Sequence, residues 1–150
     1  MARILLPLLL LLTAWSGAHA QSTGFERSAL IIETADGKQH RFSVELAVTP
    51  QQQAQGLMYR ERLETEAGML FLYEPPQEIA MWMKNTVIPL DMIFVDESGA
   101  VTGVAERTIP FSTQTIESPG LARAVLELNA GTAERLNIAP GARLIHQAFR

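Results

Sequence analysis

Apolar and polar residues alternate along much of this chain with the two-residue period of β-strands. Ala29–Thr34 is apolar and β-branched, and from Phe42 to Val48 every second residue is a large apolar one. The pair Asp36–Gly37 lies between these runs, and an Asp-Gly pair in that place is a strong hairpin signal. The domain is therefore predicted to begin with a β-hairpin whose second strand buries one face.

A short helix is predicted directly after this hairpin. Thr49 is a suitable N-cap, Pro50 suits the first helical position, and Gln52 stands where a capping-box partner belongs. The helix is expected to run from Pro50 to about Leu57, with Gly56 near its exit.

Two further strands are predicted before residue 84. Gly68–Tyr73 is apolar almost throughout, which is typical of a strand covered on both faces, and Pro75–Pro76 is expected to end it. Ile79–Met83 is the next strand candidate. Pro89 interrupts the pattern after it, so residues 84–90 are predicted to form a bulge or a crossing loop.

A second hairpin and a long loop follow. Asp91–Val95 and Ala100–Glu106 flank the turn residues Asp96–Gly99. Residues 110–119 are rich in Ser, Thr and Pro and are expected to form a loop that contains a short strand, and Arg123–Leu128 is again strand-like.

The C-terminal part is predicted to contain one helix and one strand. The helix covers Thr132–Leu136, and Asn137 can take the left-handed conformation that ends it. Pro140–Gly141 is expected to turn the chain into a last strand at Arg143–Ala148.

Together these elements predict a mostly β, or α+β, domain over residues 29–150. About seven or eight short strands and two short helices are expected, and a small mixed β-barrel-like sheet closes such strands without exposed edges. The 150 residues of the chain fit a single domain of this kind.

The first 20 residues have the pattern of a cleavable secretory signal peptide. Arg3 supplies a positive charge, Ile4–Ala14 an apolar stretch, and Ala18–Ala20 a small-x-small cleavage site, so the mature chain is expected to start at Gln21. Residues 21–28 are expected to be a flexible lead-in. Since the apolar stretch is shorter than the roughly 20 residues of a membrane span, the sequence predicts a periplasmic or secreted protein without stable membrane insertion after cleavage.

Composition narrows the function classes. The chain contains no cysteine, which excludes disulfides, thiol nucleophiles and thiolate metal ligands. The net charge is −4, and removal of residues 1–20 takes away one further cation, so binding of nucleic acid or anionic lipid is not expected. No hydrolase motif, phosphate loop or zinc spacing occurs, and no cofactor is predicted.

Polar residues stand next to strongly apolar strands in separate parts of the chain. Glu127 and Asn129 share one face of a strand otherwise made of Val and Leu. Burial of such groups is unfavourable unless they are paired. The candidates for a polar-lined pocket are Arg60, Trp82, Lys84, Asn85, Asp91, Glu127 and Asn129.

Three interpretations of this set stay open. In a structural one, Lys84 or Arg60 pairs with Asp91 or Glu127. In a second, the groups converge in a concave pocket for a small polar or envelope-derived ligand. In a third, Lys84 and a carboxylate act as acid and base on an envelope glycan or peptide. A binding or accessory module is the leading functional hypothesis, with an enzyme or a structural partner in an envelope complex as alternatives.

Methionine is concentrated near the same segment. Met81 and Met83 lie two residues apart in a predicted strand, which places them on one face and Trp82 on the other. Thioethers suit Cu(I), and an indole can cover such an ion. Because methionine also fills gaps in irregular cores, core packing is the favoured interpretation and Cu(I) handling by Met81 and Met83 is an alternative.

Five blocks of the chain resemble the sequence motifs of a known family: Gln55–Arg60, Gly68–Phe71, Met81–Thr86, Ile88–Asp91 and Leu126–Gly131. Together, and in this order, they resemble the DUF192 family and span nearly all of the mature chain. The resemblance implies a small single-domain β-rich fold, often exported in prokaryotes, and a domain of unknown function. It places all seven candidate residues within signature motifs. Ala142 departs from the acidic residue expected after Pro-Gly, which affects only that turn.

Overall fold

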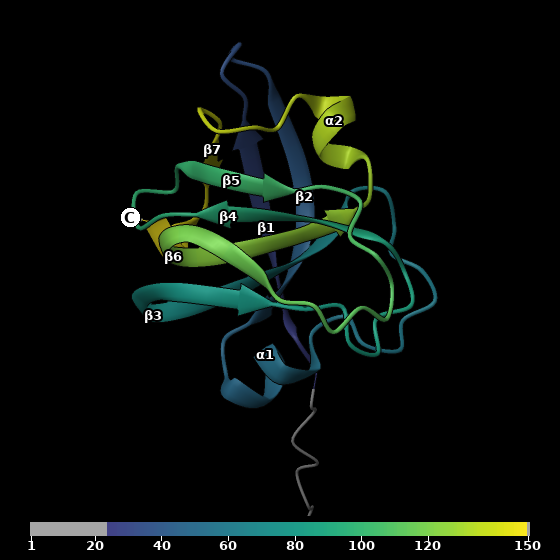
Figure 1. The fold of residues 1–150 in the computed structure, drawn as a ribbon. Coiled ribbons are helices and arrows are strands. Elements are labelled where there is room, and N and C mark those ends of the chain that lie inside the picture. Colours follow the sequence, from purple (N-terminus) through teal and green to yellow (C-terminus); the bar gives the residue numbers. More distant parts are fainter. Residues whose placement is uncertain (1–23, 150) are drawn as a thin grey trace, which may run out of the picture.

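The computed structural model describes residues 24–149, which form a seven-stranded sheet with two short α-helices and one 3-10 turn (Figure 1). The predicted signal peptide lies outside the described residues. No helix within residues 24–149 is long and apolar enough to cross a membrane. In chain order the elements are β1 (Glu26–Glu33), β2 (Gln39–Ala47), α1 (Pro50–Gln55), β3 (Ala67–Met81), β4 (Leu90–Val95), β5 (Val101–Ala105), β6 (Ile116–Asn129), α2 (Thr132–Leu136), β7 (Arg143–Ile145) and η1 (Gln147–Phe149).

The strands form a mixed sheet that curls into a nearly closed barrel. Their order is β5-β4-β6-β3-β2-β1-β7, with β2 and β3 parallel and all other neighbours antiparallel. The two ends of this order meet, because the Val101 amide donates to Ala142 at 2.9 Å and the Leu144 amide donates to Gly99 at 2.8 Å. The predicted fold class is confirmed.

Two hydrophobic cores lie on the two faces of the sheet. The barrel interior holds residues from every strand, among them Ile32, Val44 and Leu126. A second core covers the outer face of β3, β4 and β6 and contains Met69, Met92 and other apolar residues. Since side chains alternate across a strand, the apolar runs in β4 and β6 supply both cores. The outer core holds the candidate site.

The predicted hairpins and helices are confirmed. β1 pairs with β2, and β4 with β5. The capping box of α1 is formed: the Thr49 hydroxyl accepts from the Gln52 amide at 3.2 Å, and the Gln52 side chain accepts from the Thr49 amide at 3.1 Å. Gly56 ends α1 at a φ of 47°, and a Cβ there would lie 3.0 Å from the Phe71 ring. This glycine therefore lets α1 lie close against the outer core.

The prediction that Pro75–Pro76 ends a strand is wrong. β3 continues to Met81 and contains both predicted strands, Gly68–Tyr73 and most of Ile79–Met83. Its pairing with β6 skips between Leu72 and Gln77, so the prolines lie in a bulge. A bulge needs no ladder hydrogen bond at these positions, which is why two residues without an amide hydrogen are tolerated.

Three element ends also differ from the prediction. β6 begins at Ile116, inside the predicted loop 110–119, and the Ser118 hydroxyl accepts the Ile79 amide at 2.9 Å where the pairing is irregular. β7 ends at Ile145 and is followed by the 3-10 turn. β1 already begins at Glu26, so the last residues of the predicted lead-in belong to a strand.

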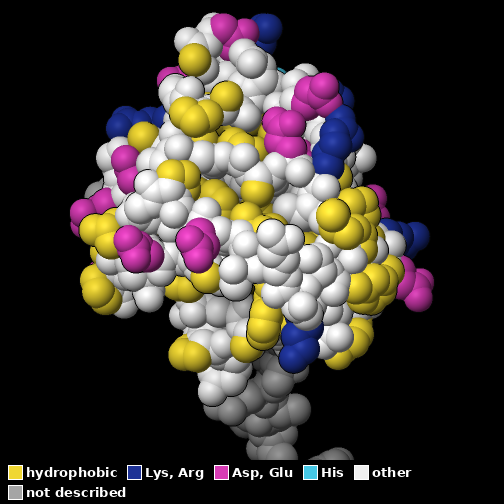
Figure 2. All heavy atoms as spheres, viewed as in Figure 1, with side chains coloured by type: hydrophobic (Ala, Val, Ile, Leu, Met, Phe, Trp, Pro, Cys, Tyr) yellow, Lys and Arg dark blue, Asp and Glu magenta, His cyan; other side chains and the backbone are white. Residues whose placement is uncertain are grey.

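The loops after α1, β3 and β5 pack together at one edge of the barrel. The Phe111 amide donates to the carbonyl of Thr86 at 3.1 Å, and the Tyr59 amide donates to that of Asn85 at 2.9 Å. Figure 2 shows apolar side chains gathered along the right-hand edge, where Figure 1 places these loops. Trp82 is one of the exposed apolar residues of these loops.

Candidate functional site

Glu127 is the buried acid of the outer core. Its neighbours across the sheet are Met69 on β3 and Met92 on β4, and only 4% of the residue is exposed. Within residues 24–149, no hydrogen bond or ion pair reaches its carboxyl group. Burial raises the pKa of Glu127 from 4.5 to about 8, because a low-dielectric surrounding disfavours the charged form. The acid is therefore largely protonated at neutral pH.

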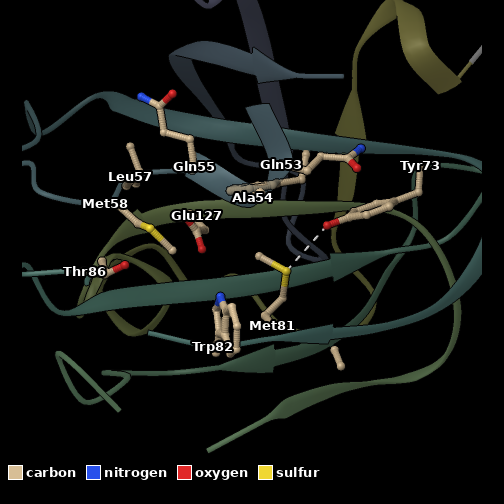
Figure 3. Close-up of a pocket in the computed structure, with 13 residues that line it drawn as sticks. Gln53, Ala54, Gln55, Leu57, Met58, Tyr73, Met81, Trp82, Thr86 and Glu127 are labelled. Atoms are coloured by element: carbon tan, nitrogen blue, oxygen red, sulfur yellow. Dashed lines mark hydrogen bonds between the residues drawn. The ribbon is translucent and has the colours of Figure 1, made fainter. Parts of the chain in front are cut away.

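A small pocket of about 100 Å³ reaches this carboxyl group from the surface (Figure 3). Its walls come from α1 and the residues just after it, from β3, and from the segment that follows β3. The lining residues are Gln53, Ala54, Gln55, Gly56, Leu57, Met58, Phe71, Tyr73, Ala80, Met81, Trp82, Thr86 and Glu127. Trp82 is 47% exposed, so one wall of the pocket reaches solvent.

Two thioethers flank the carboxyl group in this pocket. Figure 3 shows the sulfur atoms of Met58 and Met81 on either side of Glu127. The Tyr73 hydroxyl donates to Met81 Sδ at 3.6 Å, and Asn85 Nδ2 donates to Met58 Sδ at 3.9 Å. Each of the two sulfurs therefore accepts one weak hydrogen bond.

Tyr73 is the second titratable group of the pocket. Burial, and secondly the charge of Glu127, raise the pKa of its hydroxyl to about 12. Both ionisable groups of the lining are thus mainly neutral at pH 7. At neutral pH the pocket therefore presents a mainly protonated carboxylic acid, which ionises as the pH rises through about 8.

Asp91 lies elsewhere and has a structural role. It is fully buried on β4, and its two carboxylate oxygens accept the amides of Arg107 and Ala133, each at 2.8 Å. These bonds hold the loop after β5 and the first turn of α2. The N-cap of α2 is Gly131, which has no side chain that could accept a hydrogen bond from the first amides of the helix.

Asn129 and Arg60 also stabilise the fold outside the pocket. Asn129 Nδ2 donates to the carbonyls of Leu63 and Glu64, at 2.9 and 3.2 Å. Arg60 forms an ion pair with Glu45 at 2.5 Å and lies over the ring of Phe25. The pairs predicted between Lys84 or Arg60 and Asp91 or Glu127 are not among the ion pairs of residues 24–149.

Lys84 and Asn85 border the pocket without lining it. Lys84 is exposed, and its ammonium group lies 5.2 Å from the centroid of the Trp82 ring. Asn85 takes a left-handed φ of 55° and touches the pocket through Met58. Of the seven predicted residues, Trp82 and Glu127 line the pocket, and the other five do not.

The predicted methionine pair does not share this pocket. Met81 lines it, whereas Met83 is fully buried and its sulfur accepts the Thr108 hydroxyl at 3.1 Å. Met58, after α1, takes the place expected for Met83. Among residues 24–149, no group of three or more His, Asp or Glu side chains has a metal-binding arrangement.

Sequence reasoning missed the contribution of α1 and of Tyr73 to the site. The Gln53 side chain donates to the carbonyl of Leu72 at 2.6 Å, which ties the helix across β3. No local pattern predicts which face of a six-residue helix meets the sheet. The glutamate on an apolar strand face was the usable signal, and it did identify the centre of the pocket.

Comparisons with known proteins point to one family. The model of the DUF192 family, described as uncharacterized, matches residues 31–146. A crystal structure from Sinorhizobium meliloti 1021, described as a "putative transcription regulator", is 42% identical and has a TM-score of 0.82 over 83% of this chain and 97% of that chain. A protein of unknown function from Novosphingobium aromaticivorans DSM 12444 is 40% identical, with a TM-score of 0.80 over 84% of this chain and 89% of that one. No curated protein matches significantly.

Proposed function

The chain belongs to the DUF192 family, and we propose that it works as an exported binding module whose ligand site is the pocket at Glu127. One observation carries this proposal: Glu127 is only 4% exposed, and its carboxyl group, without a protein partner among the described residues, faces a pocket that reaches solvent. Buried polar groups in proteins are almost always paired. A ligand that bonds to this carboxyl group would supply the missing partner.

The size of the pocket limits the ligand. A volume of about 100 Å³ accommodates several water molecules, since one water needs roughly 10–15 Å³. It is much smaller than the ~300–1,000 Å³ of pockets for drug-sized molecules. The ligand is therefore a very small molecule, an ion, or the end group of a larger molecule.

Acid–base catalysis is the second candidate, because a carboxyl group with a raised pKa in a pocket is a feature of such sites. However, glycoside hydrolysis generally uses two carboxyl groups, and Glu127 is the only one in the lining. Lys84, the predicted partner in proton transfer, lies over Trp82 instead. Binding is therefore favoured.

The description of the Sinorhizobium relative does not supply a function for this chain. A regulator that contacts DNA directly needs Lys and Arg against the phosphates, whereas this chain has a net charge of −4. We propose no nucleic-acid partner. Export would be tested by fractionating expressing cells and sequencing the N-terminus, which is expected to start at Gln21; recovery of an uncleaved chain in the cytoplasm contradicts it.

Ligand binding can be tested by ¹H–¹⁵N NMR on the full chain, with a panel of small amides, alcohols, amines, carboxylic acids and monovalent cations (Ag(I) and tetramethylammonium) as probes. The Trp82 indole N–H reports on the mouth of the pocket. At least one class of probe is expected to shift this resonance, and the response should disappear in Glu127→Leu.

Glu117→Gln is the matched control, since it removes an exposed carboxyl group from the same strand. It should respond like the wild type. A panel that leaves the Trp82 indole unmoved, or that moves it equally in all three proteins, contradicts the binding proposal.

A further inference from the structure

We propose that the ligand of this pocket is a soft monovalent metal ion, Cu(I), held between the thioethers of Met58 and Met81 and the carboxylate of Glu127. The inference rests on the proposed function, because it concerns the same pocket. It differs from the sequence-based alternative, which paired Met81 with Met83.

The first argument is the placement of the sulfur atoms. Met58 and Met81 come from separate parts of the chain and both line the pocket, with their sulfurs on either side of the carboxyl group (Figure 3). Met69, Met83 and Met92 are fully buried and do not line it. The structure thus separates two methionines that reach the pocket from three that fill the core.

The second argument is the state of these sulfurs. Each accepts one weak hydrogen bond, Met81 from Tyr73 at 3.6 Å and Met58 from Asn85 at 3.9 Å. A thioether sulfur has two lone pairs, so each retains one for a metal ion. Soft thioether ligands select Cu(I) over harder ions.

The third argument is charge. Glu127 is the only carboxyl group of the lining, so one monovalent cation neutralises the site, whereas a divalent ion would leave a buried positive charge. Ca²⁺ takes six to eight oxygen ligands and Mg²⁺ requires an octahedral set, and one carboxylate does not supply them. The chain has no cysteine that could compete for Cu(I).

The fourth argument is the cover. Trp82 stands at the mouth of the pocket, and Figure 3 shows the nitrogen edge of its indole toward Glu127. The electron-rich face of this ring interacts with Lys84, whose Nζ lies 5.2 Å from the ring centroid. The indole therefore serves as a cover that partly excludes water, since its N–H edge and not its electron-rich face is directed at Glu127.

The test uses Ag(I), a redox-stable substitute for Cu(I), added as silver nitrate to the full chain in chloride-free buffer. Calorimetry and tryptophan fluorescence are recorded, and Trp82→Phe shows which part of the fluorescence change comes from Trp82. One ion per chain is expected to bind. Met58→Leu, Met81→Leu and Glu127→Gln should each weaken binding at least tenfold.

Met92→Leu is the matched control, because it removes a thioether from the same core, beside Glu127, that is not itself part of the pocket lining. Met83→Leu separates this site from the pair predicted by sequence. Both variants should bind Ag(I) like the wild type, and far-UV circular dichroism should show that all variants are folded.

The outcomes are distinguishable. Ag(I) affinity that survives both Met58→Leu and Met81→Leu overturns the metal inference, as does equal loss in Met92→Leu. Absence of Ag(I) binding while a small organic probe, including tetramethylammonium, shifts the Trp82 indole overturns the metal inference and leaves the proposed binding function standing. If neither Ag(I) nor any organic probe acts on this pocket, both fail.

Discussion

Glu127→Gln should make the fold more stable at alkaline pH, because it removes a charge that is costly to bury. The folded chain holds the pKa of this acid at about 8, against an ordinary 4.5. Each tenfold change in an acid dissociation constant is worth ~1.4 kcal/mol, so ionised Glu127 lowers the free energy of unfolding by about 5 kcal/mol relative to an acid that stays neutral in both states. Glutamine has nearly the shape of the protonated acid and never ionises.

The sign of the pH dependence follows from proton binding. Between pH 4.5 and about 8 the folded state binds more protons at this site than the unfolded state does, so stability falls as pH rises. The contribution is fully favourable below pH 4.5 and is lost through the folded pKa. From pH 5 to pH 9, the free energy of unfolding of the wild type should fall by about 4 kcal/mol relative to Glu127→Gln.

Urea unfolding at intervals from pH 5 to pH 9, followed by circular dichroism, measures this difference. Glu117→Gln again serves as control, because it removes the same formal charge from an exposed position of β6. Its difference from the wild type should stay within about 0.5 kcal/mol at every pH. A Glu127→Gln difference that is flat within about 1 kcal/mol, or that grows toward low pH, would refute the assignment of Glu127 as a buried unpaired acid.

Three substitutions test the groups that have structural roles. Asp91→Ala leaves two buried amides, of Arg107 and Ala133, without acceptors, and urea unfolding should show a loss of about 3 kcal/mol. Asn129→Ala removes two hydrogen bonds to loop carbonyls and should cost about 1–2 kcal/mol, with Ag(I) affinity unchanged within threefold. Thr49→Ala removes the cap of α1 and should cost about 1 kcal/mol; unlike Asn129→Ala it should also weaken Ag(I) binding, since α1 forms one wall of the pocket. An effect on stability below about 0.3 kcal/mol in any of the three contradicts the role given to that residue.

The local pattern of the sequence was sufficient to predict most elements of the fold. The helix Thr132–Leu136 and its left-handed exit at Asn137 follow from short-range signals and occur as predicted. The proline-containing strands were not predictable in this way. Whether a proline ends a strand or lies in a bulge depends on the partner strand, here β6, which is about 45 residues away in sequence.

The candidate site was only partly predictable, because sheet register decides which polar groups meet. Asp91 is paired with Leu128, and Met92 with Glu127, so the two acids point to opposite faces of the sheet. A register shifted by one residue would have placed Asp91 beside Glu127 on one face. The sequence shows that Asp91 and Glu127 are polar residues in apolar strands, but local sequence patterns do not determine how β4 and β6 pair.

The same difference in face explains why one buried acid is structural and the other is a functional candidate. Asp91 receives two amide hydrogen bonds, which compensate for its burial. Glu127 receives no bond from the described residues and has its pKa raised instead of being held as an anion. A methionine or leucine at position 127 would pack into the surrounding outer core without the free-energy cost of burying an ionisable group. An acid that weakens the fold where an apolar residue would suffice is best explained by a ligand that the acid binds.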